Sequence, residues 1–283
     1  QFLMRQNEIL TDMWNRFGVD SLSGDWDYKE SALFGYAAGR TIESFYRHNL
    51  YASDKVVAQF HEWQAGAGLL YLKSVNIPVA TVFTTHATVV GRSICGNQLP
   101  LYNHLSEYDG DAMASKLGVV SRHSLEKVSA INADVLTTVS EITARECRQF
   151  FGRDVDVITP NGFENSFTPS DDDEFLSMRK KARFKLMETA SAMTGHEVEG
   201  DAVFVGIGGR YEYRNKGIDL FLDAIDKFEK TVASRPVYAF LMIPSGHNGP
   251  VRTLQGSRST HALQNPEWDI IMRRINELGL KRV

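Results

Sequence analysis

Short apolar runs alternate with amphipathic stretches from about residue 28 to the end of the chain. Each run is bounded by turn residues and is rich in Val, Ile, Phe or Thr, which is typical of buried strands. Such an alternation predicts parallel sheets covered by helices, so the expected fold class is α/β. The strands are expected at residues 55–60, 79–84, 134–138, 155–158, 202–207 and 237–243.

The amphipathic stretches predict the helices. Ser140 is a suitable N-cap for a helix over residues 141–150, and Gly152 suits its end. Further helices are expected at 174–190, at 217–232 and at 266–278, where Pro266 begins the last one. A loop rich in Gly and Pro is expected over 245–259. A helix over 31–45 places four apolar side chains near one face: Leu33, Tyr36, Ala37 and Phe45.

The composition changes near the middle of the chain. The stretch TPNG at 159–162 is a turn signal, and the polar run at 168–173 is suited to capping the next helix. A chain of 283 residues also exceeds the size at which one hydrophobic core usually keeps growing. We therefore expect two domains, residues 1–165 and 166–283.

Charge and composition narrow the class of function. The chain has 35 acidic residues against 31 Lys and Arg, so nucleic acid is not expected as a partner. An anionic ligand must then be bound by a few locally placed cations. The apolar runs are too short for a membrane-spanning helix, and two cysteines without a CxxC motif fit a reducing compartment. We expect a cytoplasmic protein that is not bound to a membrane.

Neither a metal site nor a cysteine nucleophile is indicated. His61, His86, His104 and His123 do not have the spacing of metal ligands, so no metal is expected. No Cys-His-Asn pattern accompanies Cys95, for which a small apolar role in the core is expected.

The most informative stretch is a strand at 203–207 that runs into a turn rich in Gly and then into a helix. Glycines allow close approach of the backbone to a ligand, and a helix start supplies free N–H groups and the positive end of a dipole. Arg210 offers a planar fork for phosphate, and Lys216 adds a second cation. The residues alone leave open that both cations are solvated surface groups.

Residues 209–217, GRYEYRNKG, resemble a stretch of the fungal and animal type of glycogen synthase, glycosyltransferase family 3. The likeness extends more loosely from about residue 14 to the end, in the same order as in the family. Four shorter stretches are also similar to that family: HEWQAG at 61–66, FTTHAT at 83–88, TVS at 138–140 and PNG at 160–162.

This resemblance implies a GT-B arrangement, in which two Rossmann-like domains face each other across a cleft. The first domain would carry the acceptor side and the second the nucleotide-sugar side. The family transfers glucose from UDP-glucose to the 4-hydroxyl of an α-1,4-glucan, such as glycogen, with retention of configuration. The resemblance implies no cofactor, and UDP-glucose and the glucan as partners. We also expect a homo-oligomer.

The family's site residues carry over position by position. Arg210 and Lys216 match residues that hold the donor diphosphate, and Arg92 matches one that approaches the phosphates from the other domain. His86 matches a catalytic-site residue beside the transferred glucose. We interpret it as a hydrogen-bonding group that positions the sugar and not as a proton-transfer group. A purely structural histidine is the alternative on sequence alone.

A second group of positions has two interpretations. His61, Glu62 and Trp63 either line the acceptor side of the cleft or form a packed strand end. Asn161 is a turn residue that is also placed to contact a ligand.

Three features of the family are not matched in this sequence: a Lys-x-Gly-Gly loop, two glutamates separated by seven residues, and a basic helix that senses glucose-6-phosphate. We therefore expect the chain to begin inside the first domain and to stop within the second, with both sheets incomplete. Self-association and little transferase activity of the chain alone are expected. Another GT-B enzyme, such as an α-glucan phosphorylase or a nucleotide-sugar epimerase, and a non-catalytic binding or assembly module are the alternatives.

Overall fold

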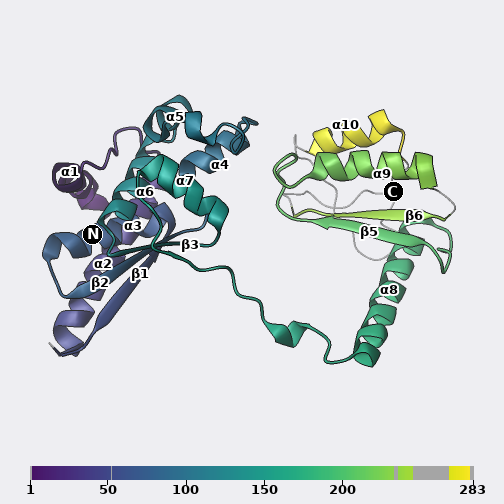
Figure 1. The fold of residues 1–283 in the computed structure, drawn as a ribbon, viewed down its shortest axis with the longest axis horizontal. Coiled ribbons are helices and arrows are strands. Elements are labelled where there is room, and N and C mark those ends of the chain that lie inside the picture. Colours follow the sequence, from purple (N-terminus) through teal and green to yellow (C-terminus); the bar gives the residue numbers. More distant parts are fainter. Residues whose placement is uncertain (1, 52, 233–234, 245–267, 281–283) are drawn as a thin grey trace. The chain divides into compact units, whose positions relative to one another are not determined.

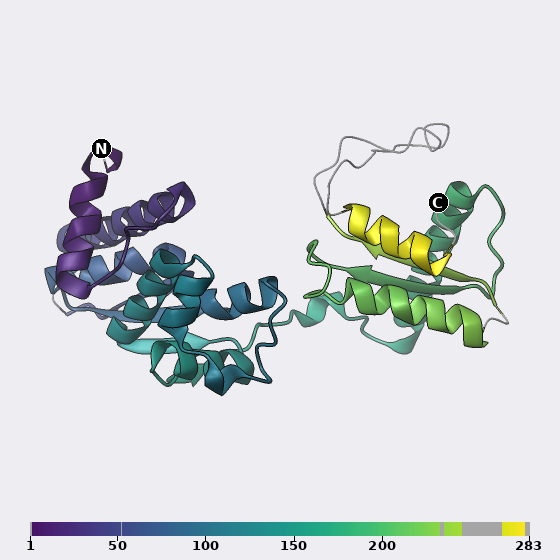
Figure 2. The ribbon, with the colours of Figure 1, turned by 90° about the horizontal axis from the view of Figure 1, so that it is seen from above.

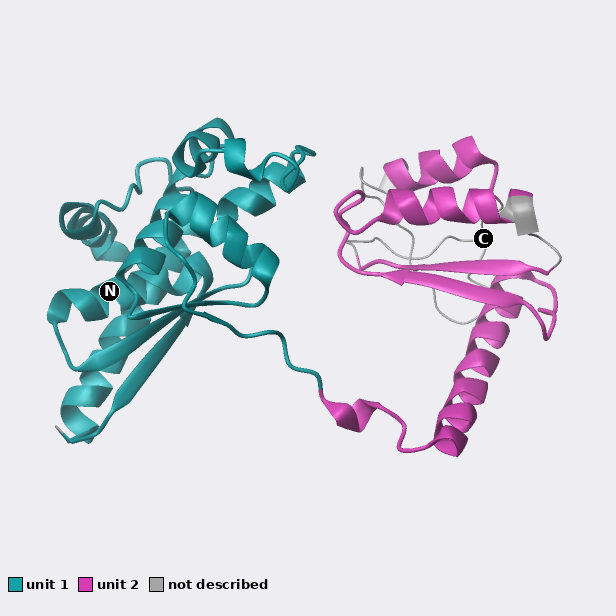
Figure 3. Ribbon diagram, viewed as in Figure 1, with its two compact units in different colours: residues 1–163 teal, residues 164–283 magenta. Residues whose placement is uncertain are grey.

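The chain divides into two compact units, Gln1–Phe163 and Glu164–Val283 (Figure 3). The computed structural model describes residues 2–51, 53–232, 235–244 and 268–280. Each unit has its own sheet of parallel strands, so the α/β class predicted from the sequence is confirmed. The loop predicted over 245–259 and the helix start predicted at Pro266 lie outside the described residues.

The sheet of the first unit has four parallel strands in the order β1-β2-β3-β4. The strands lie within a residue or two of the predicted runs, because alternate Val, Phe and Thr side chains pack into the core. Their bounds are β1 (Val56–His61), β2 (Val79–Thr85), β3 (Val135–Thr138) and β4 (Val157–Ile158).

Helices precede and connect these strands (Figure 1). Ser140 caps α7 by accepting a hydrogen bond from the Thr143 amide, and Gly152 ends it with a φ of 68°, so both predictions for this helix are confirmed. The helical elements of the unit are η1 (Leu3–Arg5), α1 (Gln6–Phe17), α2 (Trp26–Asn49), α3 (Glu62–Val75), α4 (Val89–Gly96), η2 (Leu105–Glu107), α5 (Gly110–Lys116), α6 (Val120–Asn132) and α7 (Glu141–Phe151).

Helix α2 packs closely along α3, and the contact is made by glycines. A Cβ atom at Gly39 would lie 2.7 Å from the carbonyl oxygen of Gly68, and one at Gly68 would lie 2.5 Å from that of Gly35. The apolar face predicted for this helix is only partly right. Leu33 is buried, whereas Phe45 is 58% exposed, because the buried face follows the glycines and not the large apolar residues.

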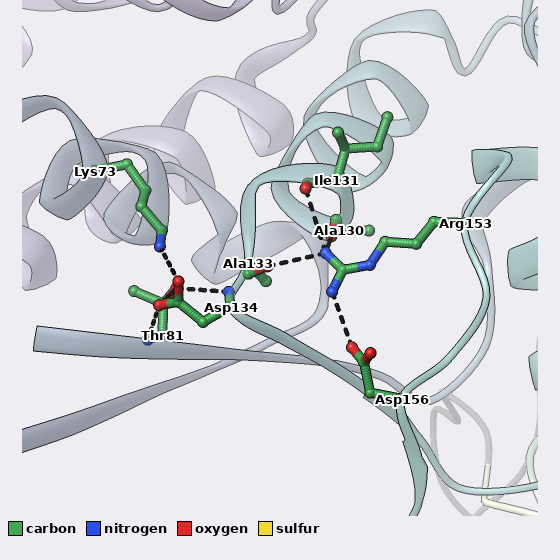
Figure 4. A network of polar contacts seen from close by, with 8 residues as sticks. All are labelled: Lys73, Thr81, Ala130, Ile131, Ala133, Asp134, Arg153 and Asp156. Carbon is green, nitrogen blue, oxygen red and sulfur yellow. Dashed lines mark hydrogen bonds and ion pairs between the residues drawn. The ribbon is translucent and has the colours of Figure 1, made fainter.

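The amino ends of the strands in the first unit are fastened by polar side chains (Figure 4). Asp134 accepts hydrogen bonds from the Thr81 amide at 2.7 Å and hydroxyl at 2.9 Å, and it pairs with Lys73 at 2.7 Å. The Arg153 guanidinium donates to the carbonyl oxygens of Ala130, Ile131 and Ala133, and to Asp156. Arg153 thereby satisfies carbonyl groups that the end of α6 leaves without helical partners.

In the described part of the second unit, two parallel strands, β5 (Val203–Gly208) and β6 (Val237–Met242), are paired along their whole length. A side chain of the predicted polar run, that of Asp171, caps α8 by accepting a hydrogen bond from the Glu174 amide. The helical elements are η3 (Asn165–Phe167), α8 (Asp172–Thr194), α9 (Ile218–Val232) and α10 (Trp268–Leu278).

Helices cover both faces of this second sheet. Helices α9 and α10 lie side by side on one face, and α8 lies on the other (Figures 1 and 2). Ile218, Leu222 and Ile271 form a buried cluster on the first face, and Ala190, Val198 and Ala202 form one on the second. Among the helices that the structure describes, none has the length and apolar character to cross a membrane.

Candidate functional site

Two of the candidate histidines meet where strands of the first sheet end. Strand β1 ends at His61, and His86 directly follows β2. Because the strands are parallel neighbours, their carboxyl ends lie at one edge, which is where open α/β sheets bind ligands. Nδ1 of His61 lies 3.0 Å from Nε2 of His86, and both residues are exposed. The structure therefore places a pair of hydrogen-bonded imidazoles at this edge.

Glu62 connects this histidine pair with Arg92. It begins α3 in the left-handed backbone region, with a φ of 60°. Its Oε1 accepts a hydrogen bond from the His86 amide at 3.0 Å and lies 3.5 Å from Nη2 of Arg92. The Arg92 side chain is 51% exposed. His86, Glu62 and Arg92 thus form one group, in which a carboxylate fixes the histidine backbone and partly neutralises the cation.

The remaining candidates of the first unit have different surroundings. Trp63 is 8% exposed, and its ring stacks on Tyr28 with 6.0 Å between the centroids and 14° between the planes. The guanidinium of Arg122 lies over the same ring, 5.5 Å from its centroid. Trp63 therefore packs in the core. Asn161 is exposed in the segment that follows β4.

Sequence analysis missed two buried carboxylates beneath the turn between β2 and α4. Glu126 of α6 is 0% exposed and Glu146 of α7 is 4% exposed. Oxygens of Glu126 accept hydrogen bonds from the Thr85 hydroxyl at 3.1 Å and the Val89 amide at 2.8 Å. In the sequence, each of these glutamates stands at a position of its helix that otherwise carries apolar residues. This signal is weak by itself.

Burial controls the protonation of Glu126. It raises the pKa of this carboxyl to about 8, because the charged form loses its hydration. The hydrogen bond from the Val89 amide opposes this rise, and the nearby charge of Glu62 adds to it. Near neutral pH, the carboxyl is therefore largely protonated.

In the second unit, the candidate cations occupy the loop that joins β5 to α9. Arg210 is 66% exposed and pairs with Glu212, with 3.0 Å between Nη2 and Oε1. The stem of Lys216 passes Gly209, where an added Cβ atom would lie 3.8 Å from Cγ and Cδ of the lysine. Gly209 has a φ of 159°. This loop thus carries two exposed cations, and no side chain at Gly209 covers the backbone beside them.

The expectation of free N–H groups at the start of α9 is wrong for its first three amides. Those of Ile218 and Asp219 donate to the carbonyl oxygen of Tyr213, at 3.0 and 3.3 Å. The amide of Leu220 donates to the Asp219 carboxylate at 2.9 Å. The tight turn before the helix satisfies these donors internally. Anion binding by this loop would consequently depend on the side chains of Arg210 and Lys216.

Within the described ranges, no group of three or more His, Cys, Asp or Glu residues is placed to hold a metal ion. Cys95 and Cys147 are free thiols, and burial raises the pKa of both. A neutral buried thiol is a poor nucleophile. Among the candidate site residues, the polar groups include imidazole, carboxylate, guanidinium, ammonium and amide groups. These groups suit hydrogen bonding to a sugar and charge pairing with phosphate.

Comparison with known proteins identifies the family of the chain. A sequence model described as glycogen synthase matches residues 2–280. The chain is 37% identical over 253 residues to a glycogen [starch] synthase of Dictyostelium discoideum, covering 86% of this chain and 28% of that protein. It is 35% identical over 285 residues to one of Neurospora crassa, covering 98% of this chain and 40% of that protein.

A glycogen [starch] synthase from mouse liver is 34% identical over 283 residues, which is 95% of this chain and 38% of that protein. The chain thus spans 28% to 40% of the length of these three relatives. The family match covers both units and every candidate residue named above. The chain belongs to the glycogen synthase family.

Proposed function

We propose that this chain supplies part of a retaining glycosyltransferase that moves glucose from UDP-glucose to the 4-hydroxyl end of an α-1,4-glucan. The observation that carries the proposal is the GRYEYRNKG loop at the carboxyl end of β5, within a chain whose family match runs over residues 2–280. The family relatives are named as glycogen [starch] synthases.

In this proposal the two units are Rossmann-like domains of a GT-B enzyme. The first unit would carry the acceptor side and the second the nucleotide-sugar side. The exposed Arg210 and Lys216 bind the donor diphosphate by charge-assisted hydrogen bonds, and they stabilise the charge that develops on the departing UDP. Arg92 approaches the same phosphates from the first unit.

His86 positions the transferred glucose through hydrogen bonds. Its backbone is fixed by Glu62 and its ring by His61, so the imidazole is pre-oriented before the sugar binds. Beside it, His61 is exposed and Glu62 is half-buried. In this proposal both contact the acceptor glucan. For Trp63 the stacking on Tyr28 supports a packing role next to that surface. Asn161 contributes a further polar contact.

The test is UDP release from UDP-glucose and glycogen. It is measured for this chain and for a version extended to the length of the Neurospora crassa relative. We expect release by the extended version and a larger rate with UDP-glucose than with ADP-glucose. Nucleotide binding without release in both versions would contradict the proposal and favour a binding module. Activity that requires inorganic phosphate, with the absorbance of pyridoxal phosphate, would favour an α-glucan phosphorylase.

A further inference from the structure

The turn between β2 and α4 carries both His86 and Arg92, and buried carboxylates hold it from below. Thr85 precedes His86 by one residue and Val89 follows it by three. Glu126 of α6 accepts a hydrogen bond from each of them, one from a hydroxyl and one from a backbone amide. The carboxyl group of one residue therefore fixes the turn on both sides of His86.

A second buried carboxylate completes the support. Glu146 of α7 accepts hydrogen bonds from the hydroxyls of Thr88, at 2.6 Å, and Tyr102, at 2.8 Å. Thr88 in turn caps α4 by accepting from the Gly91 amide at 3.0 Å. A Cβ atom at Gly91 would lie 2.2 Å from Oε2 of Glu146. The start of α4 is thus adapted to the presence of a carboxylate at this place.

Burial of the Glu126 and Glu146 carboxyl groups is not expected to stabilise the fold by itself. Glu126 has no solvent exposure, and within the described residues no ion pair joins it to a cation. A buried carboxyl group costs free energy unless its hydrogen bonds compensate, and apolar residues of similar volume are often at least as stable. Its two bonds go to the turn that bears the candidate site residues. This placement favours a role in the geometry of the site.

We propose that Glu126 is a positioning residue of the donor site, which acts through Thr85 and Val89 to hold His86 and Arg92 in place. The proposal rests on the function proposed above, because it takes His86 and Arg92 as donor-site residues. Glu126 itself lies beneath the surface and touches no substrate. The charged groups that face it are Glu62 of α3 and Arg92 of α4.

Two pairs of variants separate positioning from general stability. Glu126→Gln keeps an oxygen that accepts from the Val89 amide, and its amide nitrogen can donate to the Thr85 hydroxyl oxygen in place of the bond that Thr85 donates to Glu126. Glu126→Met fills the same space and can make neither bond. Thr85→Val removes one of the bonds, and Thr81→Val is its matched control. Thr81 lies on the same strand, is also 0% exposed and also donates its hydroxyl to a carboxylate, but at the opposite end of the strand.

The first measurement is amide hydrogen exchange of residues 86–92 in this chain. We expect Glu126→Met and Thr85→Val to raise the exchange rates of that segment by about tenfold or more, and Glu126→Gln and Thr81→Val to leave them within about twofold. Equal effects of Thr85→Val and Thr81→Val would overturn the proposal. If Glu126→Met does not fold, the comparison of Thr85→Val with Thr81→Val still shows whether the bond to Glu126 supports residues 86–92.

The second measurement is UDP release by the extended version. Displacement of a site group by about 1 Å can lower the rate about a hundredfold. We expect Glu126→Met to lower kcat at least about tenfold with a KM for glycogen within about threefold, and Glu126→Gln to restore at least about half of kcat. Equal loss in both variants, or no loss in Glu126→Met, would contradict the positioning role. Absence of release by the unsubstituted protein would instead refute the proposed function, and hydrogen exchange would still test the support of the turn.

Discussion

At the scale of single residues, each candidate phosphate-binding arginine is paired with a carboxylate. Arg92 lies 3.5 Å from Glu62 in the first unit, and Arg210 lies 3.0 Å from Glu212 in the second. Exposed ion pairs of this kind contribute little to stability, since the median is about 0 to 1 kcal/mol. A phosphate can therefore share or take over the guanidinium at low cost. We expect each pair to keep its arginine near the loop when no phosphate is bound.

Substitution of the cations in the second unit should weaken nucleotide binding. Charge-assisted hydrogen bonds contribute about 1.5 to 3 kcal/mol each, so Arg210→Ala and Lys216→Ala should each raise the Kd for UDP about tenfold or more. Isothermal titration of UDP into the extended version measures this. Arg214→Ala is the control, because Arg214 is exposed on the same loop and is not one of the residues assigned to the donor diphosphate. An unchanged Kd in both Arg210→Ala and Lys216→Ala would refute the assignment.

His86 should tolerate a hydrogen-bonding replacement better than a truncation. Glutamine has a similar reach and can still contact the sugar, so His86→Gln should retain at least about tenfold more activity than His86→Ala. The measurement is UDP release by the extended version, with His48→Ala as a control at an exposed histidine on α2. Equal and complete loss in both His86 variants would show that proton transfer is the role of this residue.

Glu126 predicts a dependence of folding stability on pH. Its pKa in the folded chain, about 8, is above the value of about 4.3 for an unfolded glutamate. The folded state therefore binds the proton more tightly than the unfolded state. The contribution of this group to the free energy of unfolding is largest below about pH 4.3 and is lost as the pH rises to about 8. Glutamine does not titrate, so Glu126→Gln should gain stability relative to the unsubstituted chain as the pH rises. We expect the free energy of unfolding of the variant, minus that of the unsubstituted chain, to be at least about 1 kcal/mol larger at pH 8 than at pH 5.

Denaturant unfolding at the two pH values measures this difference. Glu30→Gln, at an exposed position of α2, serves as the control and should show no such change. The same stability difference for Glu126→Gln at both pH values would be inconsistent with a neutral carboxyl group in the core.

At the scale of elements, glycines determine how α2 and α3 meet. A Cβ atom at Gly39 would lie 2.7 Å from the backbone oxygen of Gly68, so Gly39→Ala forces the helices apart. We expect it to lower the free energy of unfolding by about 1 to 3 kcal/mol. Gly96→Ala is the matched control, because that helical glycine has no atom within 4 Å of an added Cβ and should be neutral or slightly stabilising. Equal denaturation midpoints of the two variants would contradict the close contact.

The strands were predictable because their apolar, β-branched runs are short and bounded by turns. The same holds for the ends of α7, where Ser140 and Gly152 carry a local signal. The buried face of α2 was not predictable in this way. It is marked by Gly35 and Gly39, which contribute no hydrophobic periodicity, and Phe45 points to solvent as a result.

The site was predictable only in its parts. Strand ends indicated His61 and His86, and the GRYEYRNKG motif indicated Arg210 and Lys216, but spacing could not reveal that Glu62 links His86 to Arg92. The internal bonding of the first amides of α9 follows from the fold of its preceding turn, which motif reasoning does not describe. The roles of all these residues stay predictions until the variants are measured.

At the scale of the whole molecule, each unit has a core of its own. Among the residues that the structure describes, a large cluster that includes Phe83, Leu69 and Leu136 forms the core of the first unit. In the second unit, small clusters of described residues lie on both faces of β5 and β6. The sequence places the domain boundary at residues 165 and 166, and the units divide at Phe163 and Glu164.

The chain alone should bind nucleotide weakly and transfer little glucose. It spans 28% to 40% of the length of its relatives, and retaining transfer needs the donor phosphates, the sugar and the acceptor hydroxyl to be held together. We expect UDP release at less than about one hundredth of the rate of the extended version, with glycogen and UDP-glucose at saturation. Comparable rates in the two proteins would contradict this expectation. Homo-oligomerisation and a cytoplasmic location stay predictions as well.

The fastening at the amino ends of the strands has a consequence for laboratory evolution of this protein. These contacts, of Lys73, Thr81 and Asp134 and of Arg153 with Asp156, lie at the amino ends of the strands (Figure 4). His61 and His86 lie at the opposite, carboxyl ends. We therefore expect libraries that vary this edge to change the heat tolerance of the first unit, while the residues proposed to contact the sugar, at the other edge of the same sheet, stay unchanged.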